Sequence, residues 1–309
     1  MSAKSRLLCT TILTSALVVL SLKVKAADVA VPTKAPPQVP AWVAPAVDGF
    51  NWKVGGLGGT LANRSLAGGQ GSLSFPIGNA FGFQLDGASG SFDNRYFGAV
   101  AGHLFWRDPS RGLVGIYGSH TYWDQFGGLH ADHVAGEGEA YFGPFTVQGI
   151  AGVEFGNSQT AVTSVVASPV AVTTFFQTYD VRTRFFDEIN LAWYANDNTK
   201  LFVGHRYLGG KDALALGGEV ALPISSPYLV TAFVEGRVGE ADYHGVWGGL
   251  RLYWDQKGGK SLMARQRQDD PYNWLPESLF SIVNSVTTSA GTVTLPDGDG
   301  DGDADADGG

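Results

Sequence analysis

The chain has 309 residues, of which 43 are glycine, 12% are aromatic and 16% are charged, and its formal net charge is −8. An average protein has about 25% charged residues, so this glycine- and aromatic-rich composition favours a sheet with one face in lipid. The acidic balance argues against nucleic acid or another polyanion as a partner.

Residues 1–26 are predicted to be a secretory signal peptide. Lys4 and Arg6 precede a mostly apolar run over residues 7–22, and small residues follow at the expected cleavage site. This run is shorter than the roughly 18 to 20 residues that an α-helical membrane span needs, so we expect it to be removed. Because the single cysteine, Cys9, lies inside the leader, we expect no disulfide and no thiol chemistry in the mature chain. We also expect no cofactor.

Three regions follow the leader. Residues 27–49 contain five prolines among alanines and valines, which indicates an extended periplasmic linker. Residues 50–254 hold nearly all of the alternating pattern. Residues 255–309 carry mixed charges, then a short helix expected after Pro276, then Asp-Gly repeats, and we expect them to form a periplasmic extension with an acidic tail.

The middle region divides into twelve segments in which apolar residues alternate with small or polar ones. In 212–222, for example, Leu214 and Leu216 share one face, and Ala215 and Glu219 share the other. Period-two segments of this length predict an all-β fold, a closed antiparallel transmembrane β-barrel of about twelve strands. The predicted strands are 50–61, 69–76, 80–92, 95–106, 112–123, 131–142, 144–155, 183–195, 199–208, 212–222, 226–238 and 242–254.

Turn lengths and aromatic residues predict the orientation of this barrel. If residue 50 starts in the periplasm, the connections that return there are compact, and the long loop at 156–182 lies outside. Aromatic residues flank those periplasmic turns and predict an interfacial girdle. The predicted girdle comprises Trp52, Phe75, Phe81, Phe105, Trp106, Tyr141, Phe142, Phe145, Trp193, Tyr194, Tyr228, Tyr253 and Trp254.

Two short stretches carry a family resemblance. Ala27-Asp28-Val29-Ala30-Val31-Pro32-Thr33-Lys34-Ala35-Pro36-Pro37 followed by Phe50-Asn51-Trp52 resembles the start of alphaproteobacterial outer-membrane β-barrel, porin-like proteins. Gly249-Leu250-Arg251-Leu252-Tyr253-Trp254 looks like the closing-strand signal read by the barrel-assembly machinery. In that family the aromatic residue usually ends the chain, whereas here residues 255–309 follow it. The resemblance implies location in the outer membrane of a Gram-negative bacterium.

The strand faces opposite the lipid carry charged residues, which must avoid hydrocarbon and so point into the lumen. One hypothesis is a water-filled, acidic channel, with a constriction at Glu137, Glu139, Glu188 and Asn190. The alternative is a self-neutralising network that plugs and stabilises the barrel. The lumen-lining candidates are Asp86, Glu137, Glu139, Glu154, Glu188, Asn190, Glu219, Glu235, Lys53, Arg206, Arg237 and Arg251.

No catalytic constellation stands out, and we expect no enzyme. Ser119 and His120 are adjacent on a strand, so they point to opposite faces and cannot form a nucleophile and base pair. No Gly-x-Ser-x-Gly motif occurs. His103 and His133 are interpreted as structural hydrogen-bonding residues, and no metal site is predicted.

Two further segments leave alternatives open. The segments 160–167 and 170–176 lack charge and flank Ser168-Pro169, which fits an external hairpin usable for adhesion by strand addition, a segment folded into the lumen, or a mobile loop. The tail at 297–303 begins like a calcium loop, but Gly308 stands where the twelfth-position glutamate belongs. We therefore expect an acidic tail rather than an EF-hand.

Taken together, the sequence favours a low-specificity, weakly cation-preferring channel for small solutes. The alternative is a sealed structural or surface-interaction, adhesin-like barrel without transport activity. Expected partners are outer-membrane lipid, the barrel-assembly machinery and small cationic or neutral solutes, with no nucleic acid.

Overall fold

The computed structural model describes residues 44–295. The expected signal peptide, most of the 27–49 linker and the acidic repeats lie outside the described residues. Between residues 44 and 295, no helix is long and apolar enough to cross a membrane.

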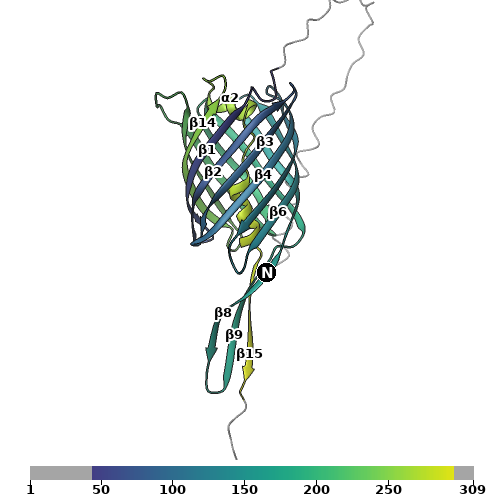
Figure 1. Cartoon of the computed structure of the whole chain (residues 1–309), viewed down its shortest axis with the longest axis vertical. Coiled ribbons are helices and arrows are strands. Elements are labelled where there is room, and N and C mark those ends of the chain that lie inside the picture. The colour runs from purple at the N-terminus through teal and green to yellow at the C-terminus, as the bar shows by residue number, and fades with distance from the viewer. Residues whose placement is uncertain (1–43, 296–309) are drawn as a thin grey trace, which may run out of the picture. The chain divides into compact units, whose positions relative to one another are not determined.

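Twelve antiparallel strands close into a barrel, which confirms the predicted fold class (Figure 1). Each strand pairs with its neighbour in sequence, except that β7 pairs with β10, and β1 pairs with β14 to close the sheet. All twelve predicted segments correspond to barrel strands. These are β1 Asn51–Leu61, β2 Arg64–Ile77, β3 Phe81–Phe92, β4 Arg95–Asp108, β5 Gly112–Trp123, β6 Leu129–Phe142, β7 Phe145–Gly156, β10 Arg184–Asn196, β11 Thr199–Leu208, β12 Lys211–Ala221, β13 Leu229–Gly239 and β14 His244–Asp255.

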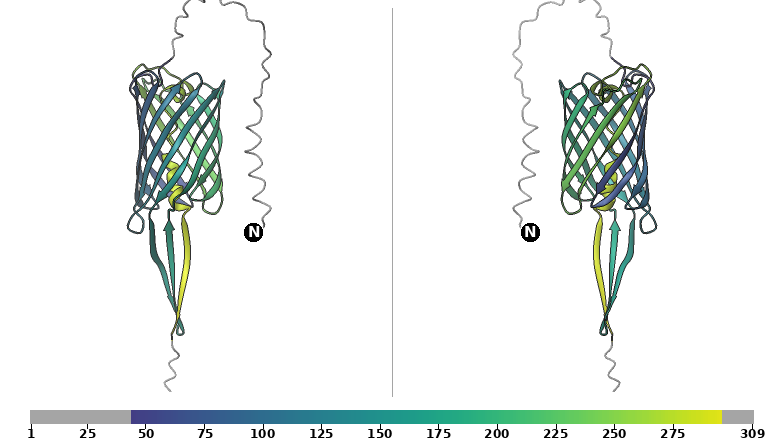
Figure 2. Two further views of the ribbon diagram at one scale, coloured as in Figure 1. Left: turned by 90° about the vertical axis from the view of Figure 1, so that its right-hand side faces the viewer. Right: turned by 90° about the vertical axis from the view of Figure 1, so that its left-hand side faces the viewer.

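The remaining strands form a separate three-stranded sheet in the order β15-β9-β8. β8 Ser158–Ala167 and β9 Ala171–Asp180 make a hairpin, and β15 Val286–Thr294 pairs along β9. This sheet extends beyond one end of the barrel (Figures 1 and 2). Of the three alternatives for the uncharged loop, the structure therefore shows the hairpin.

We name the two ends of the barrel by what lies there: the hairpin end, from which β8 and β9 extend, and the opposite α2 end. Connections at the hairpin end are also short, contrary to the orientation argument from turn length. Ala62 and Asn63 form a two-residue turn with φ of 49° and 60°, and Gly209 and Gly210 form another with φ of 61° and 75°. Positive φ at both turn residues matches the twist of the flanking strands. The connection through β8 and β9 is the exception.

The outer surface of the barrel is an apolar belt, as expected for strands in lipid. Leu214 and Leu216 of β12 are 49% and 46% exposed, whereas Ala215 between them is fully buried. Large exposed residues recur around the barrel, including Leu85, Val100, Val114, Ile116, Val134, Val153, Leu191, Leu201, Val234 and Leu250. This belt places the barrel in the outer membrane.

Four members of the predicted aromatic girdle face the lumen instead. Phe105, Tyr141, Tyr194 and Tyr253 are buried. Neighbouring residues on a strand alternate between faces, so an aromatic pair such as Tyr253-Trp254 can place only one ring against lipid. The rings that remain outside at the α2 end include Phe75, Phe81, Trp106, Phe142, Phe145, Trp193 and Tyr228.

The chain after β14 corrects the expected periplasmic extension. It forms α2 Leu262–Gln268, the 3-10 turn η1 Leu275–Ser278 and α3 Leu279–Val283, and then continues into β15. The helix expected after Pro276 is therefore present as α3. The yellow segment in Figure 1 runs through the inside of the barrel from α2 to β15. We call residues 262–285 the plug segment and the twelve barrel strands the wall. The expectation failed because the sequence does not show what this segment packs against. In the structure it packs against residues of many barrel strands.

Candidate functional site

The candidate site is the lumen of the barrel and the plug segment within it. The structure places all twelve predicted lumen residues on the inner face. Ten of them are buried, and the other two, Glu139 and Arg251, are partly buried. Their partners are protein groups, and many of these belong to the plug segment.

Glu277 of η1 is the strongest attachment of the plug segment to the wall. Arg206 of β11 donates to it from Nε at 2.5 Å and from Nη2 at 2.9 Å, and Arg237 of β13 donates from Nε at 2.9 Å. Arg206 also donates to Asn190 at 2.8 Å and lies 3.3 Å from Glu188. One carboxylate of the plug segment thus partners two buried guanidinium groups of the wall.

A second polar layer lies between Glu277 and α2. Arg251 of β14 donates to Glu219 at 2.8 Å and to Glu235 at 3.3 Å, so three predicted lumen residues form one network. The plug segment joins it through Tyr272, which donates to Glu235 at 2.9 Å, and through Gln266, which donates to Glu219 at 3.3 Å. Arg251 balances one of the two carboxylates, and Glu235 also lies 3.1 Å from Arg237.

Other predicted residues bind the plug backbone or neighbouring strands. Lys53 Nζ donates to the carbonyl oxygen of Pro271 at 3.2 Å. Glu154 accepts from the backbone of Gly209 at 2.9 Å and lies 3.1 Å from Arg184 Nε. Lys53 thus holds the middle of the plug segment, whereas Glu154 bonds within the barrel; near the end of the plug segment, Asn284 Nδ2 donates to the carbonyl oxygen of Leu208 at 2.9 Å.

Asp86 and Glu137 belong to a network made by wall strands alone. The ring nitrogens of His103 lie 3.0 Å from Asp86 Oδ2 and 2.7 Å from Glu137 Oε2. Glu139 separately accepts from Tyr141 at 2.7 Å and from Gln148 at 3.0 Å. The register aligns Glu137 with Glu188, both opposite Ile150 of β7, and Glu139 with Asn190, both opposite Gln148. Their hydrogen-bond partners differ, because Glu137 bonds with His103, whereas Glu188 and Asn190 lie beside Arg206.

α2 anchors the plug segment at its own end of the barrel. Its first turn bonds to the β10–β11 connection, where Met263 donates its backbone NH to Asp197 at 2.9 Å. Arg267 donates to the carbonyl oxygens of Gly143 and Phe145 at 2.8 and 2.9 Å. Arg265 also forms an ion pair with Asp255 at the end of β14.

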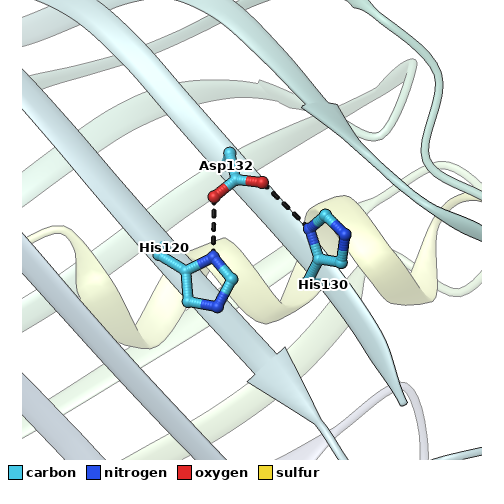
Figure 3. A group of neighbouring side chains, drawn as sticks. All are labelled: His120, His130 and Asp132. Atoms are coloured by element: carbon cyan, nitrogen blue, oxygen red, sulfur yellow. Dashed lines mark hydrogen bonds and ion pairs between the residues drawn. The ribbon is translucent and has the colours of Figure 1, made fainter. Parts of the chain in front are cut away.

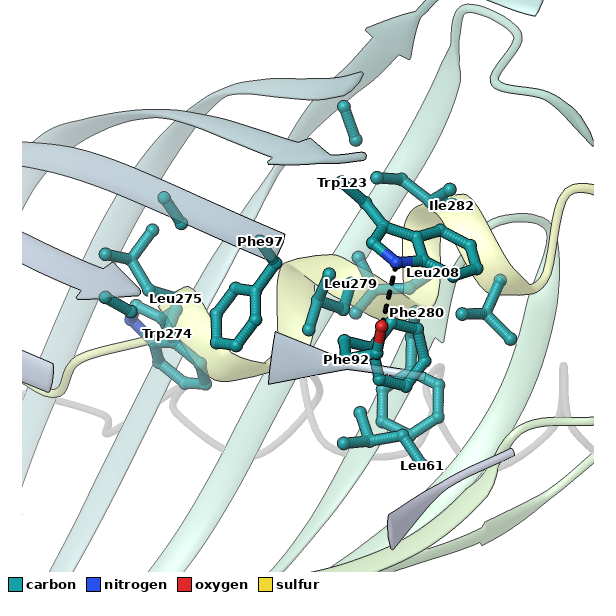
Figure 4. Close-up of a cluster of buried hydrophobic side chains, with 14 of the residues drawn as sticks. Leu61, Phe92, Phe97, Trp123, Leu208, Trp274, Leu275, Leu279, Phe280 and Ile282 are labelled. Atoms are coloured by element: carbon teal, nitrogen blue, oxygen red, sulfur yellow. Dashed lines mark hydrogen bonds between the residues drawn. The ribbon is translucent and has the colours of Figure 1, made fainter. Parts of the chain in front are cut away.

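Toward the hairpin end the lumen is apolar and packed. Phe280 of α3 is fully buried, with its ring centroid 4.4 Å from that of Tyr243. Figure 4 shows wall and plug side chains interleaved there, with Trp123 donating from Nε1 to the carbonyl oxygen of Phe92 at 3.1 Å. The cluster includes Leu61, Phe92, Phe97, Trp123, Leu129, Phe186, Leu208 and Trp247 of the wall and Trp274, Leu275, Leu279, Phe280, Ile282 and Val283 of the plug segment.

The cavity beside the polar half of the plug segment measures about 30 Å³. Lys53, Ser72, Arg251, Asp270 and Tyr272 are among its lining residues. A water molecule needs about 10 to 15 Å³ measured this way, so the cavity holds about two. This space is small because the plug segment fills most of the lumen beside it.

Ser119 and His133 form a hydrogen-bonded chain between wall and plug segment. Ser119 Oγ lies 3.0 Å from His133 Nδ1, and His133 Nε2 lies 3.0 Å from Ser281 Oγ. His133 is only 3% exposed, and hydroxyl groups occupy both of its ring nitrogens. This arrangement fits a structural role. His120, next to Ser119, is exposed and bonds to Asp132 on the outer face, as strand geometry predicts.

Sequence reasoning missed the plug residues Trp274, Glu277 and Phe280. A signal was present: residues 274–283 are largely apolar within an otherwise polar extension. A second signal was that strand alternation places Phe92 and Trp123 on the inner face of the barrel, away from lipid. Large apolar residues on the lumen side indicate something packed against them.

Comparison with known proteins adds little beyond the fold. No protein-family model matches the chain, and no curated protein matches it in sequence. A chain solved in a study of in-meso crystallization of membrane proteins is 11% identical, with a TM-score of 0.45 over 78% of this chain and 99% of that one. The β domain of the Bordetella autotransporter BrkA is 11% identical, with a TM-score of 0.35 over 66% of this chain and 98% of that one.

The Acinetobacter baumannii outer membrane protein Omp33 is similar at 10% identity, with a TM-score of 0.33 over 67% of this chain and 98% of that one. At TM-scores below 0.5, none of these likenesses assigns an activity. The structure itself shows an outer-membrane β-barrel whose lumen is filled by its own C-terminal segment.

Proposed function

We propose that this protein is a sealed outer-membrane anchor that displays its C-terminal strand and the β8–β9 hairpin outside the cell. The observation that carries this proposal is the contact of Glu277 with Arg206 and Arg237 inside the barrel. Because β15 pairs with β9 beyond the hairpin end, the chain runs through the barrel from end to end.

The energetics favour a plug segment that stays in place. Its withdrawal would remove the carboxylate that Arg206 and Arg237 share, and losing one partner of a buried ion pair costs about 3 to 5 kcal/mol. Withdrawal would also expose Phe280 and its neighbours to water, at about 1.5 to 3 kcal/mol for each large apolar side chain. Thermal motion alone would rarely open such a lumen.

The hairpin end is proposed to face the exterior. Long connections of bacterial barrels lie outside the cell, and the connection through β8 and β9 is the long one. The displayed sheet has two outer edges, β8 and β15, and neither strand contains a charged residue. Edges without charge or proline accept a further strand readily, which supports a surface-interaction role through strand addition.

We further propose that the protein has no enzymatic activity and that its membrane partners are outer-membrane lipid and the barrel-assembly machinery. The resemblance of its mature start is the basis for proposing an alphaproteobacterial source.

The second candidate is the low-specificity, weakly cation-preferring channel, in a state with the plug segment displaced. The Asp86–His103–Glu137 network favours it, because wall strands alone build it and its acids would remain on the wall. Small cationic or neutral solutes would then pass.

Planar-bilayer recording on three forms of the mature protein tests these candidates. We expect the full chain to show no steady conductance, and a form ending at Gly259, which lacks the plug segment, to conduct. A form ending at Ser285 keeps the plug segment but loses β15, and it should stay closed. Gel mobility with and without boiling verifies that each form is folded.

Steady conductance of the full chain, equal to that of the form ending at Gly259, would overturn the sealed anchor in favour of the channel. Cation preference of the open form should weaken at high salt, because ions screen the wall charges.

A further inference from the structure

A group of two histidines and one aspartate lies on the outer face of the barrel near the hairpin end. His120 Nδ1 is 2.7 Å from Asp132 Oδ1, and His130 Nδ1 is 2.9 Å from Asp132 Oδ2. Figure 3 shows both rings directed at the one carboxylate. A ligand atom from each residue lies within 4.8 Å of the other two.

Strand geometry explains why these side chains meet. His120 and Asp132 are directly opposite in the β5–β6 register. His130 precedes Asp132 by two residues on β6, so both point to the same face. The backbone of a closed barrel holds all three positions, and ligand binding would need side-chain rotation only.

The position of the group is next to the apolar belt but outside it. Along β5 the outward residues run from Val114 and Ile116 to His120, and along β6 from Val134 to Asp132 and His130. His120 and His130 are 52% and 36% exposed at their side chains, and Asp132 is 21% exposed. A charged group would be costly within the hydrocarbon, so this level marks its boundary. It is open to ions from solution.

The donor set suits a divalent transition metal of intermediate softness. Neutral imidazole nitrogen and carboxylate oxygen are the ligands of three-residue Zn²⁺ sites, where water takes the fourth position. Hard cations such as Mg²⁺ and Ca²⁺ prefer oxygen and gain little from two imidazoles. A lone histidine and aspartate pair would suffice for a hydrogen bond, so the second imidazole on the same carboxylate calls for another explanation.

We propose that His120, His130 and Asp132 form a Zn²⁺ site on the outside of the barrel. Each imidazole offers one nitrogen lone pair and Asp132 one carboxylate oxygen. A ring that binds through Nδ1 carries its proton on Nε2, so the imidazole stays neutral. Binding of Zn²⁺ involves no change of oxidation state. The bound ion links β5 to β6 beside the connection at residues 124–128.

Isothermal titration of the folded mature protein in detergent with ZnCl₂ tests the site, using protein without a polyhistidine tag. We expect one Zn²⁺ per chain, and a loss of at least about tenfold in affinity for each of His120→Asn, His130→Asn and Asp132→Asn. Co²⁺ in place of Zn²⁺ should give the d–d absorption of a coordinated ion in the parent and not in these variants.

The matched control is His205→Asn. His205 is also an outward histidine near the hairpin end, with Asp187 at 2.9 Å and Asp212 at 3.1 Å, but it has a single imidazole. Its variant should bind Zn²⁺ like the parent. Unchanged binding in His120→Asn, His130→Asn and Asp132→Asn, or equal loss in His205→Asn, would overturn the proposal. Heat-modifiable migration of each variant excludes misfolding, and these substitutions on the outer face of the barrel should preserve it.

Discussion

Arg206 on the barrel wall and Glu277 in the plug segment form a bidentate ion pair, with nitrogen to oxygen distances of 2.5 and 2.9 Å. Both side chains are almost completely shielded from solvent. In such surroundings an unpaired charge is far more costly than the pair, so the contact fixes the position of the plug segment.

Glu277→Gln removes the charge that both arginines share. We expect this variant to lose about 3 to 5 kcal/mol in its free energy of unfolding, because two buried guanidinium groups lose the carboxylate that they share and keep only Glu188 and Glu235 nearby. Urea titration of the protein in lipid vesicles measures the loss. Glu240→Gln is the control, since Glu240 is exposed near the hairpin end and should change stability by less than about 0.5 kcal/mol. Equal stability of the two variants would contradict the role of Glu277 in holding the plug segment.

Phe280→Ala tests the apolar half of the plug segment. Its ring is fully buried between Tyr243 and Trp247, with centroids at 4.4 and 6.4 Å. A cavity of this size should cost about 3 to 5 kcal/mol in thermal or urea unfolding. Val293→Ala on β15, where the side chain is 68% exposed, should cost little. If both variants unfold alike, α3 is not packed inside the barrel in solution.

Removal of β15 tests its pairing with β9. A form ending at Ser285 uncovers one edge of β9, where Phe175 and Phe176 lie. We expect chymotrypsin to cut the hairpin there at least several-fold faster than in the full chain, because an unpaired edge strand opens more easily. Cleavage is followed by mass spectrometry of protein in detergent. Identical rates in the two forms would show that β15 does not cover β9.

Much of the barrel could be predicted from sequence, because strand alternation is a local property. The faces of 212–222 follow from whether each position is apolar or small, without knowledge of any partner. The alternation also predicts that Glu219 and Arg251 point inward. It does not predict that Arg251 bonds to Glu219, because strand order and register around the closed sheet decide which inward charges meet.

The path of the extension could not be predicted for a different reason. Glu277 looks like a surface residue in a polar tail until Arg206 and Arg237 are brought to it from strands far away in sequence. Charged inward residues fit a wet lumen and a plugged one equally well. The aromatic residues Phe92 and Trp123 on the inner face at the hairpin end distinguish the two, since water does not favour them.

Labelling of single cysteines on intact cells tests most directly whether the chain runs through the barrel to the outside. The sole natural cysteine, Cys9, lies in the predicted leader, so Ser289→Cys on β15 and Ser225→Cys at the α2 end each supply one exposed thiol. A membrane-impermeant maleimide should label Ser289→Cys on intact cells, and Ser225→Cys only after the outer membrane is opened. Labelling of Ser225→Cys but not Ser289→Cys on intact cells, or of neither until the membrane is opened, would contradict display of the C-terminal strand.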